Sequence, residues 1–468
     1  KAYSVGGAIG GEVAVAVNLA VAENSGSTYH AAVSNSKFVN GFGIVINNHV
    51  RESALSHVIA ASLAKEISGF INVAVTTLNP EVKSEIRNLI ESYFREDNLV
   101  NPNPNRRVEI FAQHDGNAQA KADGIVVAKT LSLGASVAVS SLKPTIEAAL
   151  ASTTTASNYW IDSNIPWLIE ARQNVNRDGT FVETGASSEA SASGGGTFSG
   201  TGSIAVANNK PIVKARTAVL GNLKLSELEI NALTYTKSNA ETKGLSIGGI
   251  GLGAAVTSAT SDGNVEASFD TGSTNKNIIK LEIKSLVYDY AHSSSTSGVG
   301  GIVAANGSVA NATSGTDSTA RIFGSALLTG GEVTVASVSR PKSVATANGI
   351  NAGGLAVGVS AAYATVKPVV RAFVDANVTS KSLTVLAQKL HQDIANVDIT
   401  HSTATAKASA GALIGINATV AKALDESNVS AEIANSRTIR SELVSVLATN
   451  YSTQKAVASN LTITLGLA

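Results

Sequence analysis

The sequence predicts an all-β protein, a parallel β-solenoid (β-helix) built from about eight repeats of roughly 52 residues, with a short helical insertion. Two observations carry this prediction: a composition dominated by small and β-branched residues, and a short pattern that recurs along the chain. Charged residues make up 15% of the chain and aromatic residues 4%, whereas soluble proteins usually carry about 25% charged residues. Small and β-branched side chains suit flat, closely stacked strands better than a bulky globular core.

The recurring pattern is a turn residue followed by a strand with one buried face. Apolar or small residues stand two, four and six positions after each turn residue, and a spacing of two places side chains on one face of a strand. The position four residues on is alanine in all repeats but one, and we expect these residues to stack in one column. The turn residues are Ser27, Pro80, Pro144, Pro211, Gly263, Thr316, Pro368 and Ser427, and the column is Ala31, Ser84, Ala148, Ala215, Ala267, Ala320, Ala372 and Ala431.

The position three residues after each turn points away from the proposed core. It reads His30, Lys83, Glu147, Lys214, Glu266, Thr319, Arg371 and Ser430. If each repeat forms one wide coil, the middle four charges alternate in sign along an outer column, and such cross-strand pairs stabilise by about 0.2–1 kcal/mol each. If each repeat forms two narrow coils, these charges lie about 10 Å apart and interact only weakly.

Glycine-led apolar runs precede the turn residues, for example 248–256, 353–360 and 134–140. In these runs large and small residues alternate. We expect Leu355, Val357 and Val359 to face the core. The small residues Ala356, Gly358 and Ser360 would then form a smooth outer face that packs against an insertion, another sheet or another chain, because a solvated strand face normally carries charge.

Two longer repeats hold insertions, near residues 84–107 and 151–166. Apolar residues at helical spacing predict a short amphipathic helix over Ser84–Glu96, followed by an Asn-Pro turn over Asn101–Asn105. The second insertion carries both tryptophans, Trp160 and Trp167. A Gly/Ser-rich stretch, Gly185–Gly202, is expected to be a long turn. Both insertions are expected to project from the stack of coils.

A single repeat cannot bury its apolar face alone, so neighbouring repeats must stack into a continuous core. Residues 1–468 are therefore expected to form one continuous array, with an array of antiparallel sandwiches as the alternative. The first residue is Lys1 rather than Met, and Leu461–Ala468 looks like the opening of a further repeat. We expect the chain to be a fragment of a longer one.

The repeat of a Gly-rich apolar strand, a Pro or turn residue and a Val-x-Ala strand resembles the leukotoxin-type filamentous adhesins, within the filamentous-haemagglutinin-like bacterial surface proteins. The resemblance is clearest over Gly244–Val338 and Ile350–Gln388. It implies a β-helical shaft in a long protein exported by a Gram-negative-type bacterium to the extracellular space or cell surface, with a role in attachment or host-cell damage. The shaft motifs define no catalytic residues.

Chemical motifs point to no catalytic, cofactor or metal site. The seven histidines fit neither the zinc-protease pattern nor zinc-finger spacing. The net charge is +0, which lacks the basic footprint of nucleic-acid binding, and no run has the length of a membrane helix. Exposed aromatic residues make good contact points, so Tyr159, Trp160 and Trp167 form either a predicted contact surface or a lid over an apolar coil.

These inferences favour a non-enzymatic function, the structural shaft of a secreted or cell-surface filamentous adhesin. The alternatives are a part of a secreted leukotoxin-like toxin and a solenoid enzyme acting on glycans. The expected partners are other copies of the chain, associated laterally or end to end, and a host or neighbouring cell surface.

Overall fold

A computed structural model describes residues 1–468 except 40, 96–105, 153–159, 219–220, 392–399 and 465–468. The described residues form 21 strands and no helix. The strands are β1 (Ala2–Gly10), β2 (Val13–Ser34), β3 (Ile44–Ala64), β4 (Ile67–Arg87), β5 (Ser92–Phe94), β6 (Val108–Ala128), β7 (Leu131–Leu142), β8 (Thr145–Ala151), β9 (Trp160–Ser163), β10 (Trp167–Gln173), β11 (Ala186–Asn209), β12 (Ile212–Ala218), β13 (Asn222–Ser261), β14 (Asn264–Asp270), β15 (Lys276–Ser314), β16 (Asp317–Val366), β17 (Val369–Lys389), β18 (Ser402–Asp425), β19 (Asn428–Ile433), β20 (Ile439–Asn450) and β21 (Gln454–Thr464).

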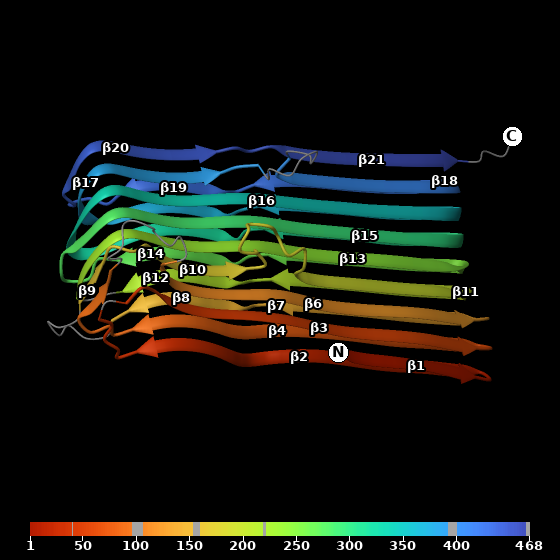
Figure 1. Cartoon of the computed structure of the whole chain (residues 1–468). Coiled ribbons are helices and arrows are strands. Elements are labelled where there is room, and N and C mark those ends of the chain that lie inside the picture. Colours follow the sequence, from red (N-terminus) through yellow and green to blue (C-terminus); the bar gives the residue numbers. More distant parts are fainter. Residues whose placement is uncertain (40, 96–105, 153–159, 219–220, 392–399, 465–468) are drawn as a thin grey trace.

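The pairings between these strands are parallel and join each coil to the next. Figure 1 shows the coils stacked in chain order, with long strands lying across the direction of stacking. The predicted parallel β-solenoid is therefore confirmed.

Each repeat forms one wide, flattened coil made of two passes. In the coil that contains β15, an outgoing pass runs from Lys276 to Gly300, and a return pass runs from Val303 to Ser314 and continues into the next strand. The alanine column shows one coil per repeat, because Ala215 pairs with both Ala148 and Ala267. The same register joins all eight members of the column. This prediction is confirmed, and the two-coil alternative is wrong.

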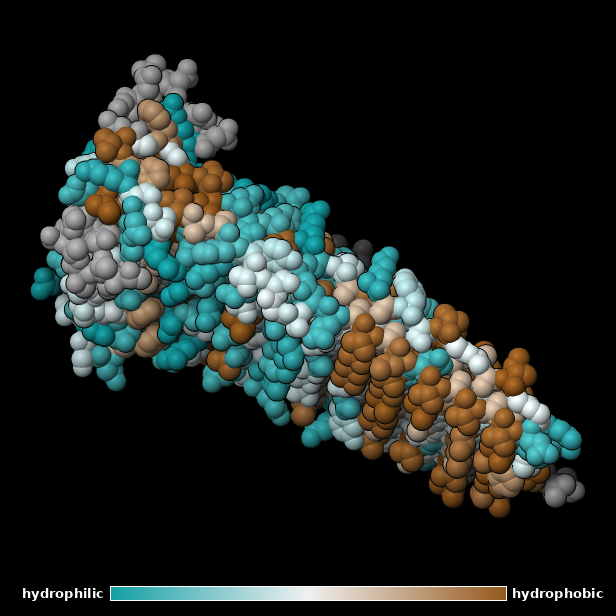
Figure 2. Space-filling view, turned by 90° about the horizontal axis from the view of Figure 1, so that it is seen from below, coloured by the Kyte–Doolittle hydropathy of each residue, from teal (hydrophilic) through white to brown (hydrophobic). Residues whose placement is uncertain are grey.

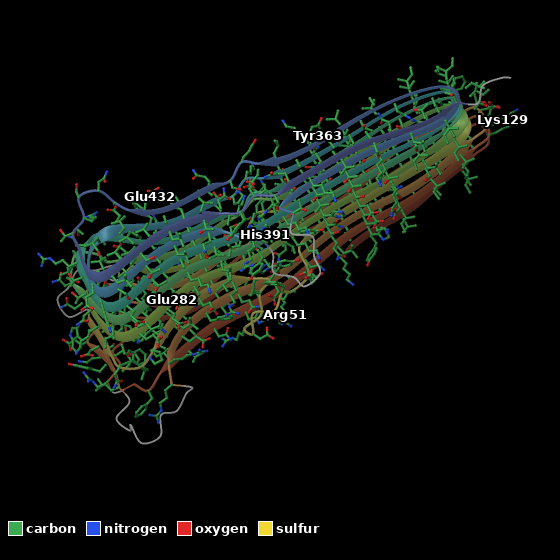
Figure 3. The ribbon with its side chains drawn as sticks, turned by 90° about the horizontal axis from the view of Figure 1, so that it is seen from above. Arg51, Lys129, Glu282, Tyr363, His391 and Glu432 are labelled. Carbon is green, nitrogen blue, oxygen red and sulfur yellow. The ribbon has the colours of Figure 1, made fainter. Side chains whose placement is uncertain are left out.

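The narrow turn between the two passes requires glycine in the middle coils. A Cβ atom on Gly248 would lie 2.2 Å from the carbonyl oxygen of Gly196, and one on Gly301 would lie 2.1 Å from that of Gly248. Gly353 repeats this contact with Gly301 at 2.1 Å. The glycines stack because any side chain here would overlap the backbone of the preceding coil. Figure 3 places Lys129, from the equivalent turn of an earlier coil, at the narrow end of the molecule.

The interior differs between the two halves of each coil. Toward the broad end the core consists of Val, Ile, Leu and aromatic side chains, such as Ile110, Trp167 and Phe269. Toward the narrow turn it consists almost wholly of alanine, interleaved with buried Ser and Thr. Small interior residues let the two passes approach closely, and the molecule tapers toward this end (Figure 3).

Hydroxyl groups bridge the two passes inside the narrow half. Ser56 lies 2.7 Å from Thr76, Ser188 donates to Ser140 at 2.8 Å, and Ser293 donates to Thr257 at 2.6 Å, in each case between buried side chains. A buried hydroxyl without a partner costs about 1–3 kcal/mol. Pairing across the interior satisfies these hydroxyl groups, whereas the buried hydroxyls of Ser136, Ser203 and Ser297 have no hydrogen-bond partner among the described residues.

The predicted orientation of the Gly-led runs is wrong. Ala356 and Ser360 are fully buried, whereas Leu355 and Val359 are 38% and 46% exposed. The alternation of large and small residues is present, but the small residues face the interior, where the two passes lie close together and a larger side chain such as Val299 is accommodated opposite Gly251 and Gly253. The large apolar residues consequently lie on the outside.

The predicted helical insertion is also wrong over its described residues. Ser84–Arg87 ends β4 and pairs with β8, and Ile86 and Phe94 are fully buried in the broad core. Positive φ angles at Asn88 (55°) and Glu91 (38°) turn the chain between β4 and β5. Pairing with the neighbouring coil overrides the helical spacing of the apolar residues. Glu96 and the turn over Asn101–Asn105 lie outside the described residues.

The described residues of the tryptophan-bearing insertion from Trp160 onward belong to the coil rather than projecting from it. Trp160 begins β9, which pairs with β5 and β13, and Trp167 begins β10, which pairs with β6 and β13. The expected long turn over Gly185–Gly202 is wrong, because from Ala186 onward these residues belong to β11, which pairs with strands on both sides. The added residues of this repeat include a segment that the sequence did not indicate, 174–185, where Phe181 stacks on Tyr235 with ring centroids 4.8 Å apart.

Candidate interaction surfaces

The outer side of the return passes carries four adjacent columns of apolar residues and glycine, which we name the return face. The columns are Val13, Ile67, Leu131, Phe198, Ile250, Val303, Leu355 and Ile414; Val15, Gly69, Leu133, Gly200, Leu252, Ala305, Val357 and Ile416; Val17, Ile71, Ala135, Gly202, Ala254, Gly307, Val359 and Ala418; and Leu19, Val73, Val137, Ile204, Val256, Val309, Ala361 and Val420. Every position in them is apolar or glycine.

Many of these side chains are strongly exposed. Leu133 and Leu252 are each 54% exposed, and Val17 is 70% exposed. Figure 2 shows hydrophobic side chains gathered in parallel rows along the narrow part of the molecule. Most monomeric soluble proteins expose no apolar patch larger than a few hundred Å², so a continuous apolar face across eight coils indicates an interaction surface.

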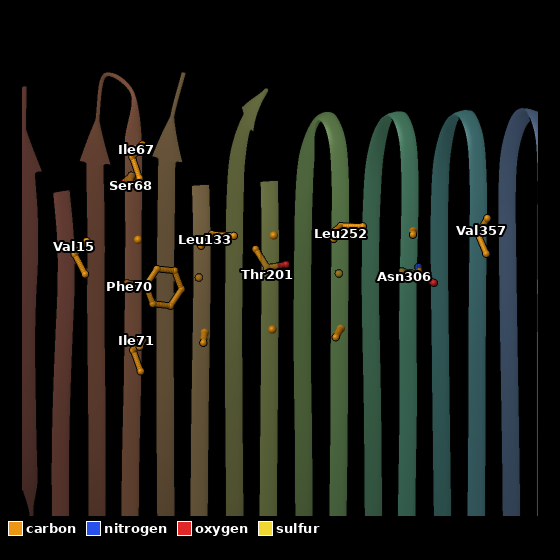
Figure 4. Close-up of a pocket in the computed structure, with 18 residues that line it drawn as sticks. Val15, Ile67, Ser68, Phe70, Ile71, Leu133, Thr201, Leu252, Asn306 and Val357 are labelled. Atoms are coloured by element: carbon orange, nitrogen blue, oxygen red, sulfur yellow. The ribbon is translucent and has the colours of Figure 1, made fainter. Parts of the chain in front are cut away.

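A shallow groove of about 770 Å³ crosses the return face. Its floor lies where the second and third columns carry small residues, among them Gly69, Gly200, Gly202 and Ala254. The larger side chains of Leu133, Leu252 and Val357 alternate with these glycines, as Figure 4 shows. The groove contains no charged residue, so it offers shape and apolar area but no group for acid–base chemistry.

The outer side of the outgoing passes is different, because it mixes charged, polar and apolar residues. Around Asp123, the side chains of His57 and Ser191 lie at 3.2 Å and 2.6 Å. Lys121 bridges to Glu189 at 3.2 Å. Nearer the narrow turn this side also carries exposed apolar residues, such as Ile125 and Leu245. The two faces of the coil stack are therefore chemically distinct.

The two tryptophans expected to form a contact surface or a lid lie in different surroundings. Trp167 is fully buried and packs edge-on against Phe94, with ring centroids 5.3 Å apart. Trp160 is half-buried and packs edge-on against Tyr93 at 4.4 Å. Tyr159 lies outside the described residues. Trp167 therefore stabilises the broad core, whereas Trp160 reaches the surface beside a shallow pocket that includes Asp162 and Lys224.

The predicted outer charge column is in register, since Lys214 pairs with both Glu147 and Glu266. The short ion pairs, however, run diagonally to the adjacent column: Arg216 lies 2.5 Å from Glu147, and Arg321 lies 2.7 Å from Glu266. One ion pair also runs along the predicted column itself, from Lys83 to the directly opposed Glu147 at 3.7 Å, so the ion pairs are shared between two columns.

Buried charged groups serve the fold. Asp289 accepts hydrogen bonds from the Thr236 hydroxyl at 2.7 Å and from the Thr316 backbone N–H at 2.8 Å, and so holds the turn of the return pass. Burial raises the pKa of Asp289 to about 6. Buried Lys276 donates to the carbonyl oxygen of Gly221 at 2.6 Å, and burial lowers the pKa of Lys276 to about 8.

Two buried carboxylates of the broad half are paired with arginine, whereas Glu229 lies opposite Glu282 on the neighbouring strand, and burial and that carboxylate raise the pKa of Glu229. Glu109 is almost fully buried and contacts Arg107 at 2.5 Å and Arg177 at 2.6 Å. Glu170 contacts Arg172 at 2.6 Å. Within the described part of the chain, no three His, Asp or Glu side chains gather in a way that could hold a metal ion. No helix among the described residues has the length and hydropathy needed to span a membrane.

The candidate surface is therefore the return face, a feature of the whole coil stack rather than of a few residues. Trp160 and Trp167, the expected contact residues, are not part of the return face. The signal in the sequence was the large–small alternation of the Gly-led runs, which is compatible with either set of residues facing outward. Neither family models, curated proteins nor solved structures provide a match to this chain.

Proposed function

We propose that this chain is a structural segment of a large extracellular or cell-surface filamentous protein of the adhesin type. The observation that supports the proposal most is the parallel pairing of the strands from coil to coil, which holds the alanine column in register through eight coils. Such a stack resists bending because every coil is hydrogen-bonded along its length to the next. A rigid scaffold that presents surfaces is a role that this architecture performs without catalytic groups.

Two arginine-paired carboxylates of the broad half and the apolar groove support a structural role over catalysis on glycans. Solenoid enzymes gather free acids and bases on one outer face. Here the carboxylates of Glu109 and Glu170 are held by arginine side chains, and the groove of the return face is apolar. These contacts stabilise the coil stack and leave these two carboxylates paired.

Immunogold electron microscopy of the source cells, with antibodies raised against the purified chain, tests the proposal. We expect gold particles outside the cell, on fibres or layers at its surface. Label confined to the cell interior would contradict the extracellular role. A parallel assay on a panel of acidic polysaccharides is expected to show no turnover, and measurable turnover would favour the enzymatic alternative.

A further inference from the structure

We propose that the return face is the docking surface for a second copy of this chain, which packs sheet against sheet. This inference does not depend on the cellular location proposed above, because it concerns the purified protein alone. It starts from the four columns defined above, which are continuous and apolar and of which many members are exposed.

The area of the return face matches that of a stable dimer interface. Columns two residues apart lie about 6.6 Å from one another, and coils lie about 4.8 Å apart. Four columns across eight coils therefore cover roughly 27 by 38 Å, or about 1,000 Å² on each copy. Stable protein–protein interfaces bury about 800 Å² on each partner, so the return face alone is large enough.

The shape of the return face suits another sheet. Two β-sheets pack face to face when apolar side chains of both inner surfaces interdigitate, about 10 Å apart. The outermost columns carry large residues such as Phe198, Leu355 and Leu19, whereas the columns between them include Gly200, Gly202 and other small residues. Both copies carry the same surface. The large side chains of the outer columns of one copy can therefore pack into the groove formed by the small residues of the other.

The chemistry of the return face favours a protein partner of the same kind over a lipid surface. Interfacial membrane binding usually combines apolar residues with Lys and Arg. The four columns contain no Lys or Arg, and Phe198 is their single aromatic residue. A partner must therefore supply a flat, uncharged, apolar surface, and a second return face is such a surface.

Sedimentation velocity with matched variants tests the proposal. We expect the wild-type chain to sediment as a species of twice its 47.5 kDa mass. The double variant Leu133→Lys, Leu252→Lys places two charges in the return face and is expected to sediment as a single chain. The control is Ile125→Lys, Leu245→Lys, at residues 57% and 45% exposed on the outgoing side; it should retain the doubled mass.

A wild type that sediments as a single chain up to about 100 μM would overturn the proposal, since a stable interface has a Kd well below that concentration. Doubled mass that persists in both double variants would place the interface elsewhere and would also overturn it. Co-sedimentation of a single-chain wild type with anionic or zwitterionic vesicles would assign the return face to lipid instead.

A second measurement keeps the test decisive if the lysine variants unfold. The chain has no cysteine, so a single spin label can be attached at Leu252→Cys or, as the control, at Leu245→Cys. We expect collisions with a water-soluble paramagnetic reagent to fall several-fold at residue 252 when the protein is concentrated. At residue 245 they should stay constant, and an unchanged signal at both sites would refute docking through the return face.

Discussion

Phe70 occupies space in the narrow interior that two glycines leave open. A Cβ atom on Gly124 would lie 2.1 Å from the Cε2 atom of Phe70, and one on Gly134 would lie 2.4 Å from its Cε1 atom. We expect Gly124→Ala to lower the free energy of unfolding by about 1–3 kcal/mol, because overpacking a close-packed interior forces side chains or backbone to move. Urea denaturation measures the change.

Gly202→Ala is the matched control, since nothing lies within 4 Å of the Cβ atom that it would add. Its free energy of unfolding should stay within about 0.5 kcal/mol of the wild type, as for other surface substitutions. Equal effects of the two substitutions would show that loss of glycine, rather than contact with Phe70, determines stability.

Asp289 makes stability depend on pH in a direction unusual for a carboxylate. Burial raises its pKa to about 6 in the folded chain, against 3.8 as the ordinary value. Well below pH 3.8 the group is protonated in both folded and unfolded states. As the pH rises from 4 to above 6 the unfolded chain ionises first, so folding loses stability, by roughly 3 kcal/mol at about 1.36 kcal/mol for each pKa unit.

Comparison with Asp289→Asn isolates this contribution, because all other groups titrate alike in both proteins. The difference in unfolding free energy, wild type minus variant, should fall between pH 4 and pH 7 when measured by chemical denaturation. A difference that stays flat or rises across this range would mean that Asp289 keeps an ordinary pKa in the fold.

At the scale of the strand, β10 and β9 carry the two tryptophans into different surroundings. We expect Trp167→Ala to lower the free energy of unfolding by about 3–5 kcal/mol, the usual loss for a buried large aromatic. Trp160→Ala should cost less, because this half-buried ring loses chiefly its contact with Tyr93, and aromatic pairs contribute about 0.5–1.5 kcal/mol. Guanidinium denaturation of both variants checks the order, and a larger loss for Trp160 would reverse it.

Charges on neighbouring strands should couple diagonally. A double-mutant cycle on Arg216 and Glu147 is expected to give a coupling energy of about 0.2–1 kcal/mol, as for other partly exposed pairs. The cycle on Lys214 and Glu266, which are directly opposed, should give a smaller value because the carboxylate of Glu266 is already held by Arg321. If the directly opposed pair couples more strongly, direct opposition on neighbouring strands, rather than the length of the side chain, determines the interaction.

The strands also show what periodicity predicts and what it leaves open. The alanine column was predictable because Ala148, Ala215 and Ala267 recur at one offset from a turn, and parallel stacking brings equal offsets together. Which residues of Leu355–Ser360 face inward was not predictable. Alternation alone defines two faces, and which face is buried depends on the distance between the two passes. Ile86 looked helical because its spacing is local, whereas its partner strand β8 lies in the next coil.

For the whole molecule, the coil is the unit that can be removed. Deleting residues 264–316 would join Gly263 to Asp317, which occupies the place of Asn264 in the next coil. We expect this variant to retain a cooperative β-sheet unfolding transition in circular dichroism, since nearest-neighbour contacts between equivalent coils are preserved. Deleting residues 264–290 removes half a coil and should abolish that transition; survival of both deletions would indicate that the register is not constrained.

The arrangement of one wide coil per repeat also determines the proportions of an assembly. About 52 residues add one strand spacing, about 4.8 Å, along the stacking direction, whereas an outgoing pass of 25 residues extends about 80 Å across it. Each added repeat therefore lengthens the stack by only one strand spacing, while the coil stays wide across the stack. An array of this design has the aspect ratio of a plank, and negative-stain images of longer arrays should show ribbons with flat sides rather than thin round fibres.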